Sequence, residues 1–134
     1  FATERDVGDE PVQRLGLGNE TFGWSTAARD FDGDGFDDLV AGAPAAWAGD
    51  VGGPDKPGAA HLWYGPIAET VDFSFTADLL LEGEIGGYRS FTGYAVALED
   101  VDGDGGMDLL VSSPLFQAGI VDVLPGGLTG LFGF

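Results

Sequence analysis

The sequence predicts an all-β protein with two four-stranded antiparallel sheets, and three observations carry this prediction. Glycine accounts for 24 of the 134 residues and proline for 7, a composition that favours many turns over long helices. The apolar residues gather in short segments that Gly, Pro or Asp bounds, and no longer window keeps a helical period. A large part of the chain also repeats itself.

The repeat aligns two long segments at an offset of 70 residues. The first is residues 23–44 (GWSTAARDFDGDGFDDLVAGAP), and it matches residues 93–114 (GYAVALEDVDGDGGMDLLVSSP) without a gap. The match resumes at an offset of 61 with residues 58–65 on residues 119–126, so the first copy carries about nine extra residues. The expected insertion is Ala48 to Pro57.

Short apolar segments within each repeat are the expected strands. They include Leu62–Tyr64 in the first copy and Tyr94–Leu98, Leu109–Val111 and Ile120–Leu124 in the second. Two further segments that match more loosely, Val12–Gly18 and Ala77–Gly83, are expected outer strands. Four strands in a repeat of about 70 residues is typical of a β-propeller blade.

The repeat divides the chain into four parts. Residues 1–20 are an N-terminal segment with a candidate outer strand, residues 21–83 and 84–127 are two blades, and residues 128–134 are an apolar tail. The second blade has only three expected strands by Leu124. Because an uncovered sheet edge invites pairing, we expect a homo-oligomer in which the N-terminal strand of one subunit completes the second blade of the next. The apolar tail is the competing occupant of that edge.

An acidic loop of the pattern D-x-D-x-D-G-x-x-D lies between the first two strands of each copy. Alternate side chains of a tight loop point into one concavity, and the glycine at position 6 permits the positive φ that the turn needs. A backbone carbonyl at position 7 and the last carboxylate can complete a shell of oxygen ligands, which is typical of calcium. The sequence therefore predicts two Ca²⁺ sites, formed by Asp30, Asp32, Asp34, Phe36 and Asp38 and by Asp100, Asp102, Asp104, Gly106 and Asp108.

The acidic loops have two other interpretations. Solvated Asp-Gly turns are common in hairpins, but carboxylates about 5 Å apart repel by roughly 3 kcal/mol per pair, which favours a cation between them. An EF-hand loop needs a glutamate at position 12 and flanking helices. Position 12 is Ala41 in one copy and Val111 in the other, and strands follow, so an EF-hand is rejected.

The net charge of −18 argues against nucleic acid and anionic membranes as partners. Two calcium ions would bring the net charge only to −14, and we attribute the remaining acidity to a salt-rich environment. The absence of cysteine excludes a disulfide framework, a thiolate zinc site and a cysteine nucleophile. No segment is long and apolar enough to be inserted in a membrane as a spanning helix.

The motifs in this order resemble the FG-GAP repeat of integrin α-subunit propellers and of many bacterial extracellular proteins. Phe22-Gly23 and Gly42-Ala43-Pro44 stand where the family has its name-giving residues, and the acidic loop lies between them. The second copy departs at both sites, with Phe91-Thr92-Gly93 and Ser112-Ser113-Pro114, while its loop is intact. The resemblance implies four-stranded blades with calcium on one rim, a stiffened scaffold, and partner binding on the other loops.

The remaining notable residues are assigned to packing. His61 is the single histidine and lies in an expected strand, and no Ser, His and acid arrangement is suggested, so we expect no catalysis. Blade packing is expected of the aromatic residues Trp24, Trp47, Trp63, Tyr94 and Phe116. Asn19 begins an Asn-Glu-Thr sequence that fits a glycosylation site.

Two functional classes follow from these observations. The first is a non-catalytic, extracellular, calcium-binding structural or adhesion module that assembles with itself, or binds another extracellular protein or a glycan. The second is an accessory propeller fragment of a larger secreted enzyme or adhesin. The first is preferred, because no catalytic constellation is visible in the sequence.

Overall fold

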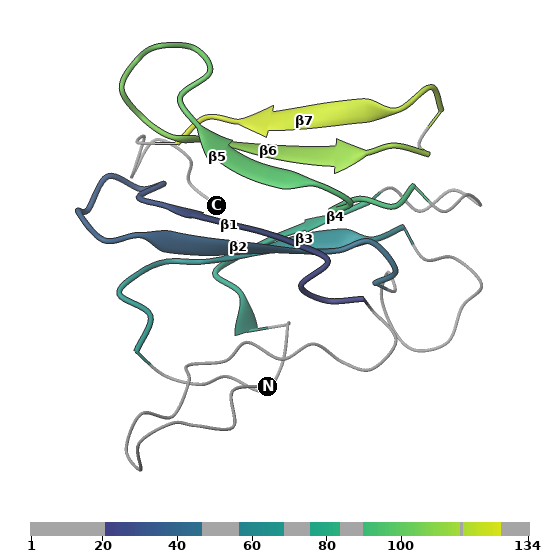
Figure 1. Cartoon of the computed structure of the whole chain (residues 1–134), viewed down its shortest axis with the longest axis horizontal. Helices are drawn as coiled ribbons and strands as arrows, with labels where there is room; N and C mark the ends of the chain where they lie inside the picture. The colour runs from purple at the N-terminus through teal and green to yellow at the C-terminus, as the bar shows by residue number, and fades with distance from the viewer. Residues whose placement is uncertain (1–20, 47–56, 69–75, 84–89, 116, 127–134) are drawn as a thin grey trace, which may run out of the picture.

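The computed structural model describes residues 21–46, 57–68, 76–83, 90–115 and 117–126. These residues form two antiparallel β-sheets, one stacked on the other (Figure 1). The first sheet has the order β1-β2-β3-β4, and its strands are Ser25–Arg29, Asp38–Ala43, Ala59–Trp63 and Leu79–Glu82. The second sheet has the order β5-β6-β7, and its strands are Val96–Glu99, Asp108–Ser113 and Ile120–Leu124.

The two sheets are built alike because the two sequence copies are alike. Ser25 pairs with Gly42 across β1 and β2, and Leu39 pairs with Trp63 across β2 and β3. In the second sheet Val96 pairs with Val111, and Leu109 pairs with Leu124. The all-β meanders confirm the predicted fold class, and the strand Leu79–Glu82 pairs with β3 in the first sheet.

The second sheet has three strands within the described ranges, where the fold class predicted four. The expected strand of residues 12–17, the glycosylation sequence at Asn19 and the apolar tail of residues 128–134 lie outside the described residues. Most of the expected insertion, residues 48–56, also lies outside them. The strand β7 is therefore one edge of the second sheet as described. This agrees with the prediction that the second blade has only three strands up to Leu124.

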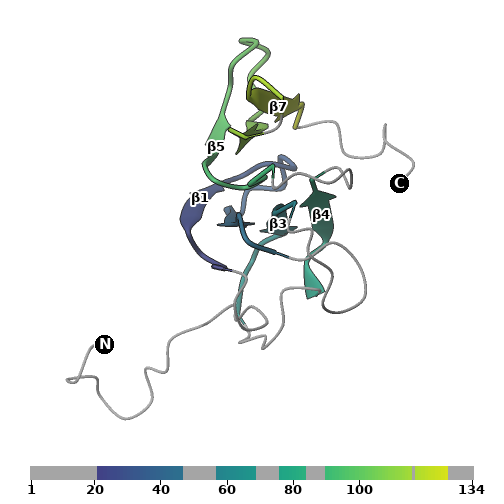
Figure 2. The same cartoon turned by 90° about the vertical axis from the view of Figure 1, so that its right-hand side faces the viewer.

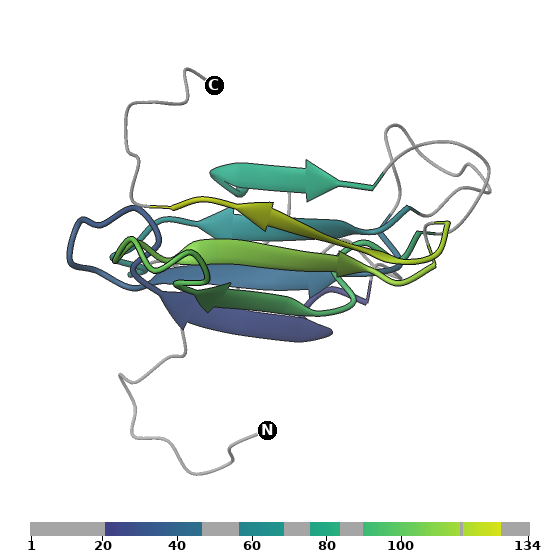
Figure 3. The ribbon, with the colours of Figure 1, turned by 90° about the horizontal axis from the view of Figure 1, so that it is seen from above.

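The hydrophobic core fills the space between the two sheets. Figures 2 and 3 show the second sheet lying over the first, with β5 above β1. One apolar face of each sheet supplies the side chains, and burial of each large one contributes about 1.5 to 3 kcal/mol. The buried members are Phe31, Val40, Ala60, Leu62, Leu98, Leu109 and Val111. Alternation in the strands thus gives each sheet one face for this core.

A close backbone contact sets how near the sheets approach at Gly42. The carbonyl of Gly93, in the turn before β5, lies against Gly42 of β2, where a Cβ atom would collide with it. The Ser25 hydroxyl, directly across from Gly42, donates a hydrogen bond of 3.0 Å to the same carbonyl. Glycine is required at residue 42 because any side chain would force the two sheets apart.

The aromatic residues divide between the core and the surface. Trp63 is buried, and Phe22 packs edge-on against it and against His61, with ring centroids 5.7 and 5.4 Å apart. His61 thus lies in a packed strand, as expected. The prediction of blade packing is wrong for Trp24 and Tyr94, which are 58% and 46% exposed. Each residue lies just before the first strand of its blade, and the two rings contact each other at the exposed margin, with centroids 5.8 Å apart.

Two predicted packing residues, Trp47 and Phe116, lie outside the described residues. In the described part of the chain, no helix has the length and apolar character needed to cross a membrane.

Candidate metal centre

Both acidic loops lie at the same end of the two sheets. The first connects β1 to β2, and the second connects β5 to β6 (Figure 1). Each loop is the short link of an antiparallel pair, so the strands on either side fix where it begins and ends. The repeat therefore places two equivalent groups of carboxylates on one rim of the fold.

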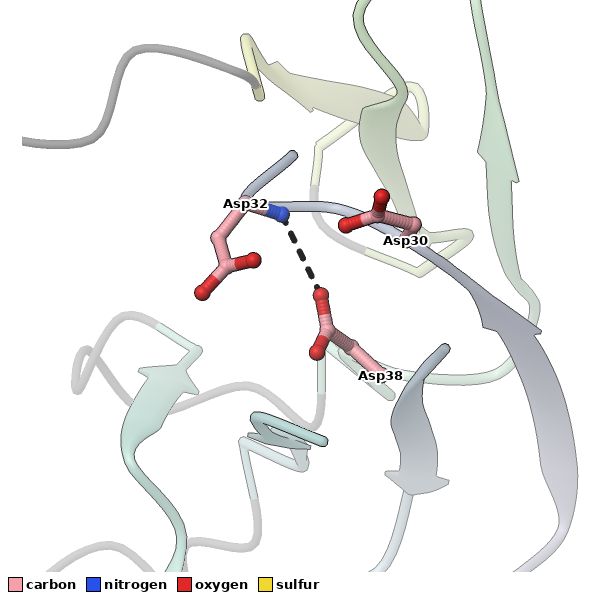
Figure 4. Close-up of side chains that lie close together, drawn as sticks. All are labelled: Asp30, Asp32 and Asp38. Carbon is pink, nitrogen blue, oxygen red and sulfur yellow. Dashed lines mark hydrogen bonds between the residues drawn. The ribbon is translucent and has the colours of Figure 1, made fainter. Parts of the chain in front are cut away.

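Three carboxylates converge in each loop. Asp30, Asp32 and Asp38 each offer an oxygen, and these oxygens lie within 4.8 Å of one another. The corresponding residues of the second loop, Asp100, Asp102 and Asp108, converge within the same distance. Figure 4 shows the Asp38 carboxylate directed at the backbone of Asp32. Positions 1, 3 and 9 of the predicted pattern thus come together in both copies.

Backbone N–H groups hold the first aspartate of each loop. Asp30 accepts hydrogen bonds from Gly33 and Asp34 on Oδ1, at 2.8 and 3.0 Å, and from Gly35 on Oδ2 at 2.9 Å. Asp100 accepts from Gly103 at 2.8 Å and from Gly105 at 3.0 Å. The loop therefore wraps around this carboxylate, which fixes the position of its oxygens before any ligand binds.

The last aspartate of each loop is buried and anchors the loop to the sheet. Asp38 Oδ2 accepts hydrogen bonds from the backbone N–H groups of Phe31 and Asp32, at 2.7 and 3.2 Å. Asp108 is also buried, and its Oδ2 accepts from Val101 at 2.9 Å. Charged acceptors with backbone donors are among the stronger hydrogen bonds in proteins, so these two residues build the loop as well as lining the site.

The glycine at position 6 has the conformation that the sequence predicted. Gly35 and Gly105 have φ values of 95° and 94°, a region that other residues rarely adopt. The glycines at position 4, Gly33 and Gly103, also have positive φ, which the sequence reasoning missed. Their presence in both copies was the available signal. The two glycines at positions 4 and 6 let the chain turn twice around the first aspartate.

The middle aspartate is not part of either converging group. Asp34 Oδ1 accepts a hydrogen bond from Phe36 N at 2.8 Å, and Asp104 Oδ1 accepts from Gly106 N at 2.7 Å. The structure thus brings together three of the four predicted carboxylates and leaves the fourth at the loop turn. The roles predicted for the Asp34 and Asp104 carboxylates and for the carbonyls of Phe36 and Gly106 stay predictions.

The pKa values of Asp32 and Asp102 are raised in these loops, where several carboxylates lie close together. Burial raises the pKa of Asp32, a hydrogen bond from Asp34 opposes this, and the charges of Asp38, Asp34 and Asp30 raise it further. At Asp102 the hydrogen bond from Asp104 lowers the pKa, but burial and the neighbouring carboxylates outweigh it, and the pKa is raised. Both third-position carboxyls therefore hold their protons more strongly than an isolated aspartate does.

One contact next to the first loop was missed by the sequence reasoning. The backbone N–H of Tyr64, which follows β3, donates a hydrogen bond of 2.8 Å to Asp78. Burial raises the pKa of the Tyr64 hydroxyl, and Asp32, Asp38 and Asp78 add to this effect. The sequence did not predict that Tyr64 lies close to the acidic loop, because only the sheet brings residues 64 and 32 together.

The chemistry of the donor set suits a hard divalent cation. Every converging side chain is a carboxylate, and the groups contain no imidazole or thiolate. Calcium prefers such oxygen ligands and tolerates irregular geometry, whereas zinc and copper favour nitrogen and sulfur. A carboxylate has several lone pairs, so accepting backbone hydrogen bonds leaves each aspartate able to bind a cation.

Comparison with known proteins gives the same repeat in both halves of the chain. Residues 22–62 and 92–124 match the FG-GAP repeat. Over 96 residues the chain is 36% identical to integrin alpha-8 of Gallus gallus, covering 72% of this chain and 8% of that protein. It is 31% identical over 98 residues to integrin alpha pat-2 of Caenorhabditis elegans, covering 73% of this chain and 7% of that protein.

An enzyme shares the same region. The chain is 32% identical over 98 residues to phosphatidylinositol-glycan-specific phospholipase D of Rattus norvegicus, covering 73% of this chain and 11% of the enzyme. The chain thus spans about a tenth or less of the length of these relatives. What is shared is a repeat region and not a whole protein.

Proposed function

Because this chain belongs to the FG-GAP repeat family, we propose that it is a non-catalytic, extracellular module that binds two calcium ions and serves a structural or adhesive role. Two of its relatives are integrin α subunits, and the residues that match the FG-GAP repeat include both acidic loops. In this role, the bound ions stiffen one rim of the blades. Partners would then meet a surface whose loops are held in a single conformation.

The convergence of three carboxylates in each of two equivalent loops is the observation that carries the proposal. Three carboxylates within 4.8 Å repel one another strongly, and Arg29 is the one Lys or Arg among the residues that the structure describes. A bound divalent cation removes this repulsion in both loops. Extracellular calcium is abundant, so affinities of roughly 10⁻⁵ to 10⁻³ M suffice.

Calorimetric titration of chelated protein with calcium tests the proposal. We expect two sites in the wild-type chain and one in Asp32→Asn or in Asp102→Asn, since each substitution removes one carboxylate of one group. Glu99→Gln is the matched control, because it removes the same charge from an exposed strand residue beside the second loop. Absence of binding at millimolar calcium would overturn the proposal.

We also propose that the module assembles with itself through its second blade. In the described residues β7 is an edge strand, and exposed edges pair readily with another strand. The N-terminal segment around residues 12–17 of a neighbouring subunit is the proposed donor, and residues 128–134 are the competing one. Contacts of this head-to-tail kind produce a ring or a filament, depending on their rotation.

Removal of residues 1–18 tests this assembly. Light scattering should show large particles for the full chain in calcium and smaller ones for the shortened chain. An unchanged particle size would reject the N-terminal donor. A well-folded monomer of the full chain at high concentration would reject the assembly itself.

A second candidate function is an accessory propeller fragment of a larger secreted enzyme or adhesin. The match to phosphatidylinositol-glycan-specific phospholipase D favours this alternative, because the same repeats there belong to an enzyme. A catalytic domain encoded in the same polypeptide would support the second candidate. Calcium binding by the two loops is common to both.

A further inference from the structure

The turn after β3, formed by Tyr64 and Gly65, contacts the first acidic loop. The Gly65 N–H donates a hydrogen bond of 2.7 Å to Asp38 Oδ1. A Cβ atom at Gly65 would collide with the Asp37 carbonyl, so the turn lies directly against the loop. Asp38 is one of the three converging carboxylates of this loop. The turn therefore holds a candidate calcium ligand from outside the loop.

Asp78 holds this turn in place. Its Oδ2 accepts a hydrogen bond of 2.8 Å from the Tyr64 N–H. Asp78 directly precedes β4, the strand beside β3 (Figure 1), and its own N–H donates a hydrogen bond of 2.9 Å to the Leu62 carbonyl. The sheet thus fixes the backbone of Asp78, while its side chain is at the surface.

These contacts form a chain from Asp78 to the proposed calcium site. Asp78 holds Tyr64, and the next residue, Gly65, holds Asp38. Asp38 accepts three backbone hydrogen bonds, and a carboxylate has about four acceptor sites, so one site is left for a cation. A ligand that is held in place beforehand loses less freedom when the ion binds. The chain of contacts therefore favours binding at the first loop.

The second loop has no such chain. At the repeat offset of 61 residues, the counterparts of Tyr64 and Gly65 are Pro125 and Gly126. Proline has no N–H, so Pro125 cannot make the contact that Tyr64 makes with Asp78. Within the described ranges, Asp108 accepts its hydrogen bond from Val101 of its own loop, and Gly126 donates none to it. All these contacts lie within one blade, so the comparison does not depend on a neighbouring blade.

We propose that Asp78 is a positioning residue for the first calcium site and that the second site has no equivalent. Asp78 acts through Tyr64 and Gly65, which fix the Asp38 carboxylate, and it does not bind the ion itself. The inference rests on the calcium binding of the proposed function. The affinity of the first site depends on a residue outside its loop, whereas the affinity of the second site depends on its own loop.

The charge of Asp78 is a second way in which this residue could act on the ion. A carboxylate near the loop attracts a cation without any hydrogen bond. Asp78→Asn and Asp78→Ala both remove the charge, but the asparagine side-chain oxygen still accepts a hydrogen bond from the Tyr64 N–H. A positioning role therefore tolerates Asn and not Ala, whereas a role of the charge alone is lost equally in both variants.

Calcium titration of single-site variants by calorimetry tests the proposal. Asp102→Asn leaves the first site to be measured, and Asp32→Asn leaves the second. In the first background, Asp78→Ala should weaken calcium binding about tenfold, as expected for residues that orient a metal ligand. Asp78→Asn should retain most of the affinity. In the second background, Asp78→Ala should leave the affinity unchanged.

Two further variants control the test. Asp122→Ala removes the same side-chain atoms and charge from an exposed position of β7, and it should leave both affinities unchanged. Tyr64→Pro removes the N–H and gives the turn the residue of the second copy, so it should weaken the first site as Asp78→Ala does. Circular dichroism in a chelator checks that each variant is folded.

Three results would overturn the positioning role of Asp78. They are an unchanged first site in both Asp78→Ala and Tyr64→Pro, an equal loss in Asp78→Asn and Asp78→Ala, and an equal loss at the two sites. Calcium binding itself would survive each of these results. Absence of binding in both single-site backgrounds and in the wild-type chain would instead overturn the proposed function, and this inference with it.

Discussion

Asp38 ties the first acidic loop to the end of β3, because the Gly65 N–H donates a hydrogen bond of 2.7 Å to Asp38 Oδ1. The other carboxylate oxygen holds the backbone of Phe31 and Asp32. A single buried side chain thus joins the loop to a strand 27 residues further along the chain. The loop is therefore part of the sheet's structure and not an independent attachment.

Replacing Asp38 with Ala should destabilise the protein even without calcium. Three backbone N–H groups would lose their acceptor, and a buried unsatisfied donor costs about 1 to 3 kcal/mol. We expect a loss of roughly 3 kcal/mol, measured by urea denaturation in a chelator. Asp34→Ala is the control, since its exposed carboxylate accepts one hydrogen bond from Phe36. Equal losses in the two variants would contradict the anchoring role of Asp38.

Removal of calcium should lower the melting temperature. A cation that binds the folded loop and not the unfolded chain adds about 2.7 kcal/mol per site at a free concentration 100 times its dissociation constant. Differential scanning calorimetry in calcium and in chelator measures this difference. Asp32→Asn and Asp102→Asn should each remove about half of it. Identical melting in calcium and chelator would mean that the loops gain nothing from the ion.

Stability should depend on pH in opposite ways with and without calcium. The raised pKa of Asp32 and Asp102 means that the folded protein binds these protons more strongly than the unfolded chain. In chelator their contribution is present below about pH 4 and is lost as pH rises through the folded pKa. In calcium the ion needs ionised carboxylates, so its stabilisation grows over the same range.

Melting curves between about pH 4 and pH 7 measure this divergence. The difference between calcium and chelator should widen as pH rises. The double variant Asp32→Asn with Asp102→Asn lacks both groups, and in it the two curves should run closer together. A calcium effect that is constant with pH would rule out these two carboxyls as its source.

Gly42→Ala should weaken the contact between the sheets. The added Cβ would collide with the Gly93 carbonyl and crowd the Ser25 hydroxyl, and overpacking of this kind costs about 1 to 3 kcal/mol. Ser112→Ala, at the equivalent position of the second sheet, is the matched control and should have a smaller effect. Thermal denaturation compares them. A neutral Gly42→Ala would show that the sheets can separate there without cost.

Phe31→Ala should be far more destabilising than Val101→Ala, although both residues occupy the second position of an acidic loop. Phe31 is 7% exposed and packs in the core, so truncation should cost about 3 to 5 kcal/mol. Val101 is 53% exposed, and its loss should stay within about 0.5 kcal/mol. Similar losses at the two positions, measured by urea denaturation, would contradict this asymmetry.

The amino-acid sequence was enough to predict the strands and the acidic loops. Both are local features: alternation of apolar residues defines a strand, and the spacing of Asp and Gly defines a loop that turns around carboxylates. The repeat added the correspondence between the two copies, because the same segment in the same order folds in the same way. The spacing predicted converging carboxylates that begin at Asp30 and Asp100, but it also included Asp34 and Asp104, which are not part of the converging groups.

Only the tertiary structure decided which equivalent residues are buried. Asp38 and Asp34 look alike in the sequence, but Asp38 enters β2 and is covered by the end of β3, whereas Asp34 stays at the exposed turn. Phe31 and Val101 hold the same place in the repeat, yet Phe31 is buried in the core between the two sheets and Val101 is exposed. Burial depends on which segments lie side by side in space, and a repeating sequence cannot specify that its two copies have different neighbours.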